Sequence, residues 1–120
     1  MNYRFESQLQ VSTINKIKEK YGDDVWIFKT HDLCRVGIPD LILCFFGHFV
    51  SIELKRKQNA QRKGTMDPRY TDSDASQMQK YNIKKINAAG GSAFIGRTVP
   101  EIMERLDKIH QSLKFFEAHR

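Results

Sequence analysis

The stretch that decides the fold is residues 40–55, which read DLILCFFGHFVSIELK. Two apolar runs rich in aromatic and β-branched residues flank the pair Gly47 and His48, a pattern typical of a β-hairpin with a two-residue turn. Acidic and basic residues occur only toward the open end of this hairpin. The sequence therefore predicts two antiparallel strands with an apolar body and a charged end.

Three charged residues converge at that end. With Gly47 and His48 in the turn, Asp40 lies opposite Lys55 and diagonal to Glu53. Side chains alternate between the two faces of a strand, so all three share one face of the hairpin. Such a cluster beside an apolar hairpin costs free energy unless it binds a ligand or its members pair with one another.

Two carboxylates on one rigid surface suit a hard divalent cation, because the cation offsets their repulsion. We therefore expect Mg²⁺ or Mn²⁺ at Asp40 and Glu53, with the backbone carbonyl of Leu54 as a third ligand. A metal of this kind lowers the pKa of a bound water, and Lys55 could orient or deprotonate that water or stabilise charge on a phosphate. The alternative is a surface salt-bridge cluster without a ligand.

Further elements surround the hairpin. Apolar periodicity, turn residues and capping patterns predict helices over residues 3–21, from 73–76 to 90–91 and over 98–116, and strands over residues 25–30 and 92–96. The order α-β-β-β-α-β-α predicts an α/β fold in which helices flank a mixed central sheet. Residues 56–73 form a basic loop, and a loop of this length in a small domain is typically functional or flexible.

Length, composition and charge narrow the class of protein. A chain of 120 residues, of which 40% are hydrophobic, predicts one globular domain over residues 1–120 and excludes a disordered chain. The 20 Lys and Arg against 14 Asp and Glu give a net charge of +6, which favours an anionic partner, nucleic acid first.

The sequence does not predict a membrane-spanning protein or one stabilised by disulfide bonds. No apolar run approaches the length of a membrane span, and the first ten residues do not resemble a signal peptide. Two cysteines are too few for a disulfide scaffold, so we expect free thiols in a reducing cytoplasm, with Cys44 in the core.

Four motifs follow one another along the chain. They are Arg35-Val36-Gly37-Ile38-Pro39-Asp40, Ile52-Glu53-Leu54-Lys55, Ser76-Gln77-Met78-Gln79, and Gly90 or Gly91 near the end of the following helix. In this order, over roughly residues 6–96, they resemble the signature of the PD-(D/E)XK nuclease superfamily and, more closely, of its VRR-NUC family. The short E-x-K motif is weak alone, whereas the ordered set is specific.

The resemblance implies a restriction-endonuclease-like core and a metal-dependent phosphodiesterase that acts on DNA. It implies Asp40 and Glu53 as metal ligands and Lys55 as the catalytic lysine. It further implies that Glu6 completes the metal shell from the first helix and that Gln79 supports the site. Members of the family include stand-alone phage or bacterial proteins similar to Holliday-junction resolvases, which implies a homodimer that cuts branched DNA in the cytoplasm of a bacterium or an infected host.

Helical geometry bears on two of these residues. Glu6 lies on one line of the first helix with Ile17, inside the apolar face, which directs its carboxylate to the sheet. The alternative is a solvated glutamate favoured by the helix dipole. Gln79 shares a line with Ile83 and points inward, although it could instead only close a capping box with Ser76.

Several basic residues are candidates for phosphate contacts. Lys29 and His31 follow a strand that leads toward Asp40, and Arg35 is expected beside the site, where a bidentate phosphate contact is plausible. The basic loop adds Lys57, Arg62, Lys63 and Arg69 directly after the charged cluster. The alternatives are an exposed strand edge for the first two and a merely solvated charge run for the loop, but we expect DNA phosphates as the partner.

The final helix carries apolar residues at spacings of four and three, namely Ile102, Leu106, Ile109, Leu113 and Phe116. This stripe predicts packing either on its own sheet or across a twofold interface, which the resemblance to a homodimer favours.

Two functional classes fit these patterns. The first is a Mg²⁺- or Mn²⁺-dependent DNA endonuclease, for which the resemblance implies selectivity for branched structures. The second is a non-catalytic basic module whose acidic residues are structural. An RNA endonuclease using the same site differs from the first only in its substrate.

Overall fold

A computed structural model describes residues 6–30, 37–55 and 76–118 of the chain. Its elements are α1 (Glu6–Tyr21), the short 3₁₀ turn η1 (Gly22–Asp24), β1 (Val25–Lys29), β2 (Leu41–Phe45), β3 (His48–Leu54), α2 (Gln77–Ala88), β4 (Ser92–Gly96) and α3 (Val99–Ala118). This order confirms the predicted α-β-β-β-α-β-α succession, and the predicted boundaries hold to within a few residues.

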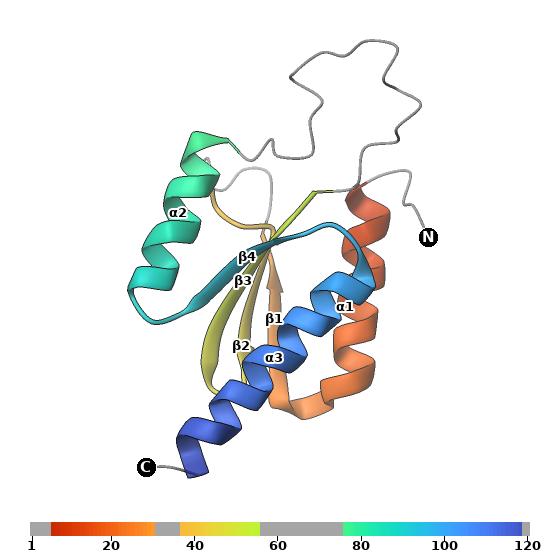
Figure 1. The fold of residues 1–120 in the computed structure, drawn as a ribbon. Coiled ribbons are helices and arrows are strands. Elements are labelled where there is room, and N and C mark those ends of the chain that lie inside the picture. Colours follow the sequence, from red (N-terminus) through yellow and green to blue (C-terminus); the bar gives the residue numbers. More distant parts are fainter. Residues whose placement is uncertain (1–5, 31–36, 56–75, 119–120) are drawn as a thin grey trace.

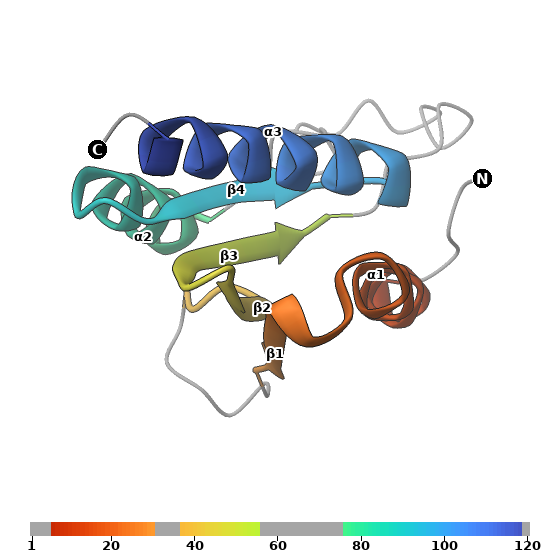
Figure 2. The ribbon, with the colours of Figure 1, turned by 90° about the horizontal axis from the view of Figure 1, so that it is seen from below.

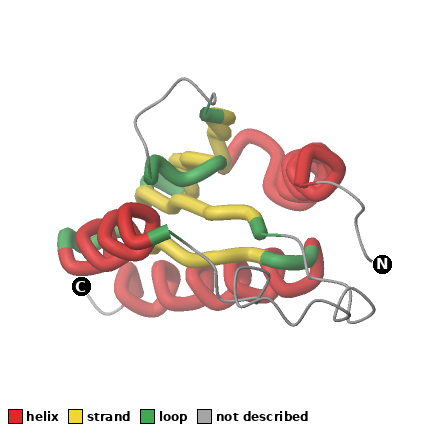
Figure 3. The backbone as a smooth tube through the Cα atoms, turned by 90° about the horizontal axis from the view of Figure 1, so that it is seen from above, coloured by secondary structure: helices red, strands yellow, loops and turns green. Residues whose placement is uncertain are grey.

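The strands form a mixed sheet in the order β1-β2-β3-β4. The first three strands are antiparallel, and β4 is parallel to β3. Helices α1 and α3 lie on one face of the sheet and α2 lies on the other (Figures 1 and 2). In the view from above, the sheet lies between α1 and α2 (Figure 3).

The hairpin is real, but its predicted register is wrong. Leu41 pairs with Ile52. The turn is therefore Phe46-Gly47, and both residues have positive φ, 51° and 79°, as a type I′ turn requires. The predicted turn lay one residue too late, because a Phe in the left-handed region is not expected from sequence. Each residue of one strand therefore faces a residue two positions away from the predicted one. Because side chains alternate with a period of two, each side chain stays on its predicted face of the hairpin.

The core lies between the sheet and the helices α1 and α3. It consists of Leu9, Ile17 and Tyr21 of α1, Leu41, Leu43, Phe45, Val50, Ile52, Leu54 and Phe94 of the sheet, and Ile102, Met103 and Leu106 of α3. Thr13, between Leu9 and Ile17, is also fully buried. The burial of Thr13 and Ile17 shows that this side of α1 faces the sheet. Glu6 was predicted to lie on the same side of the helix.

The other face of β1 and β2 is open to solvent. Trp26 pairs with Cys44, which pairs with Phe49, so these three residues share that face. Cys44 is exposed, which corrects its predicted place in the core. Helix α2 packs chiefly on β4 (Figure 2), so no described helix covers the side chains of β1 and β2 on this face.

The apolar stripe of α3 packs on its own sheet in its first half, where Ile102 and Leu106 are fully buried. Farther along, Ile109 and Leu113 are half-buried against the core, while Phe115 and Phe116 are exposed. Within the described residues, no helix is long and apolar enough to cross a membrane.

Candidate active site

The candidate residues gather at one end of the sheet. Strand β3 ends there, β2 begins there, and the N-terminal ends of both α1 and α2 point to it (Figure 1). The positive ends of two helix dipoles therefore face the same region, which favours bound anions.

Asp40 is held against β3 by its backbone and by its side chain. The Thr30 N–H donates to the Asp40 carbonyl at 3.0 Å, which continues the ladder beyond β1. The Leu54 N–H donates to Asp40 Oδ2 at 2.8 Å. Because Leu41 pairs with Ile52, the next position places Asp40 beside Glu53 rather than opposite Lys55.

The segment before Asp40 lies against α2. Asn82 Nδ2 donates to the Gly37 carbonyl at 2.7 Å, and Thr30 Oγ1 donates to the carbonyl of the buried Pro39 at 2.8 Å. Gly37 has φ +86°, and a Cβ on it would lie 2.7 Å from Met78 Cβ. Only glycine can adopt this positive φ and also pack this closely against Met78. The glycine of the G-x-P-D motif therefore lets the segment before Asp40 lie against α2.

Glu53 is the buried acid of the cluster, with 3% of its surface exposed. Gln79 Nε2 donates to Glu53 Oε1 at 2.7 Å. The Lys55 ammonium lies 3.8 Å from the same oxygen. A buried carboxylate requires hydrogen bonds or an opposite charge. Helix α2 supplies the hydrogen bond through Gln79, and Lys55 after β3 supplies the positive charge.

Gln79 performs both of the roles that were predicted as alternatives. Its Oε1 accepts from the Ser76 N–H at 2.8 Å, and its own N–H donates to Ser76 Oγ at 3.1 Å, so the capping box is complete. The amide nitrogen of the same side chain remains available to donate to Glu53. The start of α2 and the orientation of the buried acid therefore depend on one residue.

Comparison with known proteins supports this architecture. No family model matches the sequence, and no curated protein matches it. A solved structure described as a "VRR_NUC domain protein" superposes with a TM-score of 0.63, at 19% identity over 95% of this chain and 92% of that chain. A second, described as "VRR_NUC domain", has a TM-score of 0.58, at 18% identity over 88% of this chain and 94% of that chain.

The chain has the VRR_NUC fold. The sequence resemblance is thus confirmed at the level of the fold, and the mixed sheet with its three helices matches the predicted PD-(D/E)XK-like core.

The donor set at the end of the VRR_NUC sheet fits a hard divalent cation. Asp40 and Glu53 supply carboxylate oxygens from neighbouring strands. In an antiparallel ladder the N–H and C=O of one residue point to the same neighbour, so we expect the Leu54 carbonyl on the Asp40 side. Mg²⁺ commonly uses one or two carboxylates together with water and substrate phosphates. Among the described residues, no cluster of three or more His, Cys, Asp or Glu side chains forms a fuller cage.

The structure places the other residues predicted for the candidate site less closely. Lys29 ends β1 opposite Leu41, so its exposed side chain lies on the sheet face opposite that of Asp40 and Glu53. Glu6 is the first residue of α1, whose N-terminal end lies at the site, but its side chain falls outside the described part. His31, Arg35, Lys57, Arg62, Lys63 and Arg69 also lie outside the described residues.

Two supporting residues of the site were not predicted. Thr30 and Asn82 tie the G-x-P-D segment to β1 and to α2. No motif connects them to Gly37 in the sequence, and their roles arise only because α2 packs across the segment before Asp40. The one sequence feature that could have indicated the role of Asn82 is its place one helical turn after Met78.

Proposed function

We propose that this protein is a Mg²⁺- or Mn²⁺-dependent DNA endonuclease that hydrolyses phosphodiester bonds. One observation carries the proposal: the buried Glu53 carboxylate lies beside Asp40, within 3.8 Å of the Lys55 ammonium, and accepts a hydrogen bond from Gln79. A salt bridge to Lys55 is weakened by a second carboxylate on the same face, because like charges repel, whereas a divalent cation commonly binds one or two carboxylates.

Each side chain then has a distinct role. Asp40 and Glu53, with the Leu54 carbonyl, would hold the cation, and Glu6 would add a further carboxylate from α1. A cation held there would supply a water of lowered pKa and offset the negative charge of the phosphate. Lys55 would orient the attacking water, deprotonate it when its amine is neutral, or as an ammonium stabilise the charge that develops on the phosphate. Gln79 keeps the Glu53 carboxylate in one orientation.

DNA is the proposed substrate because of charge. The chain carries a net charge of +6, and helix α2, which begins at the site, contains Lys80, Lys84 and Lys85 but no acidic residue. Phosphates of a duplex or of a branched junction would meet this basic helix and the predicted contacts at His31, Arg35 and the basic loop. Lys29 lies on the other face of the sheet from α2 and is left out of this contact surface. Selectivity for branched DNA, including Holliday junctions, is part of the proposal.

Cleavage assays test the proposal directly. Labelled duplex, single-stranded and four-way-junction DNA are incubated with the protein in Mn²⁺ or in EDTA. The variants Asp40→Asn and Glu53→Gln keep the size of each acid, Lys55→Ala removes the ammonium, and Glu19→Gln removes an exposed carboxylate of α1 as the matched control. We expect Mn²⁺-dependent cleavage that falls by roughly 10²-fold in the three site variants and persists in Glu19→Gln. Calorimetry should give weaker Mn²⁺ binding for Glu53→Gln.

Two results would contradict the proposal. Equal cleavage by the wild type and all site variants would identify a contaminating nuclease. DNA binding by the wild type without cleavage of any substrate in Mn²⁺ would leave the non-catalytic basic module as the function.

We further propose that the protein is a homodimer whose second copy packs on the open face of β1 and β2. This aromatic face consists of Trp26, Phe28, Ile42, Cys44 and Phe49, none of which is charged. Trp26 and Phe28 stack with ring centroids 6.0 Å apart and are 60% and 43% exposed. Two copies that each carry +6 can approach most closely through an uncharged surface.

The size of the aromatic face is consistent with the centre of a dimer interface. Its exposed rings offer about 300 Å² per copy, against the roughly 800 Å² per partner of a standard interface. A rim around the rings must therefore supply the remainder. The largest apolar patch on a protein surface commonly has about this size and is often functional.

Trp26 is the only tryptophan in the chain, so its fluorescence reports directly on this face. We expect a dimer by sedimentation, with blue-shifted emission at high protein concentration, and a monomer for Trp26→Lys. Phe115→Lys is the matched control, because Phe115 is similarly exposed on α3. A monomeric Phe115→Lys variant together with solvent-exposed Trp26 emission in the wild-type dimer would instead assign the interface to α3.

A further inference from the structure

A groove of about 420 Å³ lies between α3 and the first residues of β3 and β4. It is remote from the candidate active site. His48 lines the groove at the start of β3, five residues before Glu53, which corresponds to about 16 Å along a strand. The groove is also on the α3 face of the sheet, because His48 and Ser92 hydrogen-bond there, whereas Glu53 faces α2.

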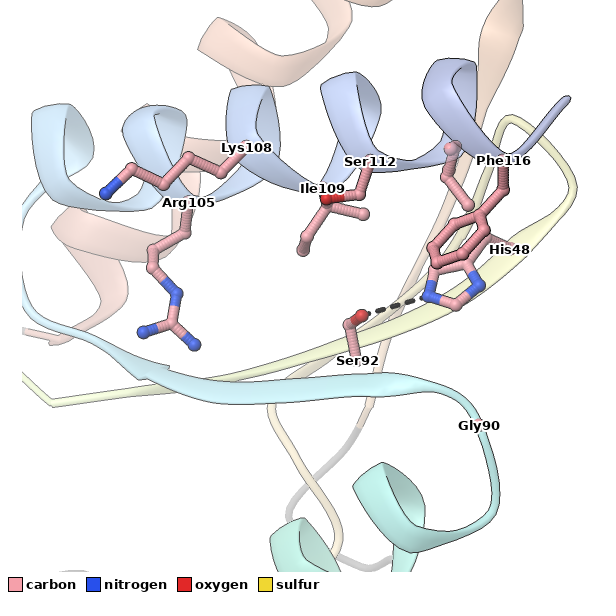
Figure 4. Close-up of a pocket in the computed structure, with 9 residues that line it drawn as sticks. His48, Gly90, Ser92, Arg105, Lys108, Ile109, Ser112 and Phe116 are labelled. Atoms are coloured by element: carbon pink, nitrogen blue, oxygen red, sulfur yellow. Dashed lines mark hydrogen bonds between the residues drawn. The ribbon is translucent and has the colours of Figure 1, made fainter. Parts of the chain in front are cut away.

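One end of the groove is cationic. Arg105 and Lys108 are one turn apart on α3, and both side chains lie at the same end of the groove (Figure 4). The Arg105 guanidinium packs over the Phe94 ring at 4.7 Å, which positions the group through its flat face rather than through its N–H edges. Lys108 forms an exposed ion pair with Glu104 at 3.3 Å, and such a pair exchanges readily for a stronger anion. Among the described residues that line the groove, none is acidic.

Serine side chains line the middle of the groove, and aromatic rings line its other end. Ser92 and Ser112 present hydroxyl groups in its middle, and the rings of His48 and Phe116 lie at the end away from Arg105 (Figure 4). Ser92 Oγ and His48 Nε2 are 2.9 Å apart, which fixes the imidazole ring. From Arg105 to Phe116 the helix rises about 16 Å.

We propose that this α3 groove binds unpaired nucleotides of DNA. Arg105 and Lys108 bind a backbone phosphate, the serine hydroxyls face the sugar, and an unstacked base lies against the rings of Phe116 and His48. The base must be unpaired, because in a duplex both of its faces are already stacked on neighbouring bases. The choice of DNA as ligand rests on the proposed function. The groove extends that function by adding single-stranded segments, as found at flaps or junctions, to the substrate class.

The test is a binding measurement that requires no catalysis. Fluorescence anisotropy with labelled dT15 is recorded in EDTA for the full-length wild type, Arg105→Ala and Phe116→Ala. Lys114→Ala is the matched control, because Lys114 is an exposed cation of the same helix outside the groove. We expect affinity to fall about tenfold for the two groove variants and less than twofold for the control. An abasic oligonucleotide of equal length should abolish the difference between Phe116→Ala and the wild type.

Three results would overturn the inference. Equal losses for Arg105→Ala and Lys114→Ala would mean a generic charge effect. An unchanged affinity for Phe116→Ala would mean that no base contacts the groove. Conversion of a dimer to a monomer by Phe116→Ala would mean that a second copy occupies it. Because the assay contains EDTA, each result is independent of whether the acid cluster cleaves DNA.

Discussion

At the scale of single residues, Gln79 connects the start of α2 to the candidate active site. Its amide oxygen caps the start of α2, and its amide nitrogen binds the buried carboxylate of Glu53. Glutamate at the same position would still accept the Ser76 N–H, as in a standard capping box. It would have no donor for Glu53 and would place a second negative charge against it.

The substitution Gln79→Glu should therefore separate the two roles. We expect its helix content to stay near the wild-type value and its melting temperature to fall at neutral pH, because the new carboxylate repels the buried Glu53. Under the proposed function, Mn²⁺-dependent cleavage should fall by roughly 10- to 100-fold, as for other groups that orient a metal ligand. Ser76→Ala is the converse variant: it removes the cap, at a cost of about 1 kcal/mol, and leaves the donor to Glu53. Equal activities of the two variants would show that the Gln79 contact to Glu53 has no role in cleavage.

At the scale of elements, β4 and α3 pack closely because Gly96 lacks a side chain. A Cβ on Gly96 would lie 2.3 Å from Ile102 Cγ1 and 3.3 Å from Ile52 Cγ2. Ile102 is fully buried, so it has little space into which to move. The crossing of α3 over the end of β4 therefore depends on a glycine at this position.

We expect Gly96→Ala to destabilise the protein by about 1–3 kcal/mol through overpacking. Urea unfolding of Gly96→Ala, Ile102→Ala and the double variant measures the effect. Because the two side chains would occupy the same space, the double variant should lose less stability than the two single variants together. Strict additivity would mean that the added methyl group does not meet Ile102.

The hairpin shows how far sequence reasoning reaches at this scale. Alternation along the strands correctly predicted that Asp40 and Glu53 share a face, because an error of two residues in register leaves faces unchanged. The identity of the facing residue was wrong, since it depends on a Phe46 with positive φ. Phe46 stacks on His110 of α3 at 4.0 Å, a tertiary contact that favours this turn and that no local pattern reveals.

At the scale of the whole molecule, one polar cluster joins the first and last helices. Lys20 donates to Asp107 at 2.6 Å, and the Tyr21 hydroxyl also donates to Asp107. These bonds, the one from Lys20 first, hold the pKa of Asp107 below its usual value. Burial and the neighbouring carboxylate raise the pKa of Tyr21.

The lowered pKa of Asp107 predicts a loss of stability in acid. In the unfolded chain Asp107 takes up a proton near pH 3.9, whereas in the folded chain it does so at a lower pH. Its contribution is therefore fully present above that value and is lost as the pH falls through the folded pKa. We expect the difference in melting temperature between the wild type and Asp107→Asn to be largest near pH 7 and to shrink toward pH 2. A constant difference across this range would mean that the cluster does not stabilise the fold.

The sequence by itself determined the succession of elements, the face on which the acids lie and the capping box of α2. These features depend on periodicity and on contacts between residues close together in the chain, so local patterns predict them. Only the tertiary structure decided the partner of each hairpin residue, the exposure of Trp26 and Cys44 and the formation of the α3 groove. Each of these depends on which surfaces the helices cover, and that choice is made by packing between segments far apart in the chain.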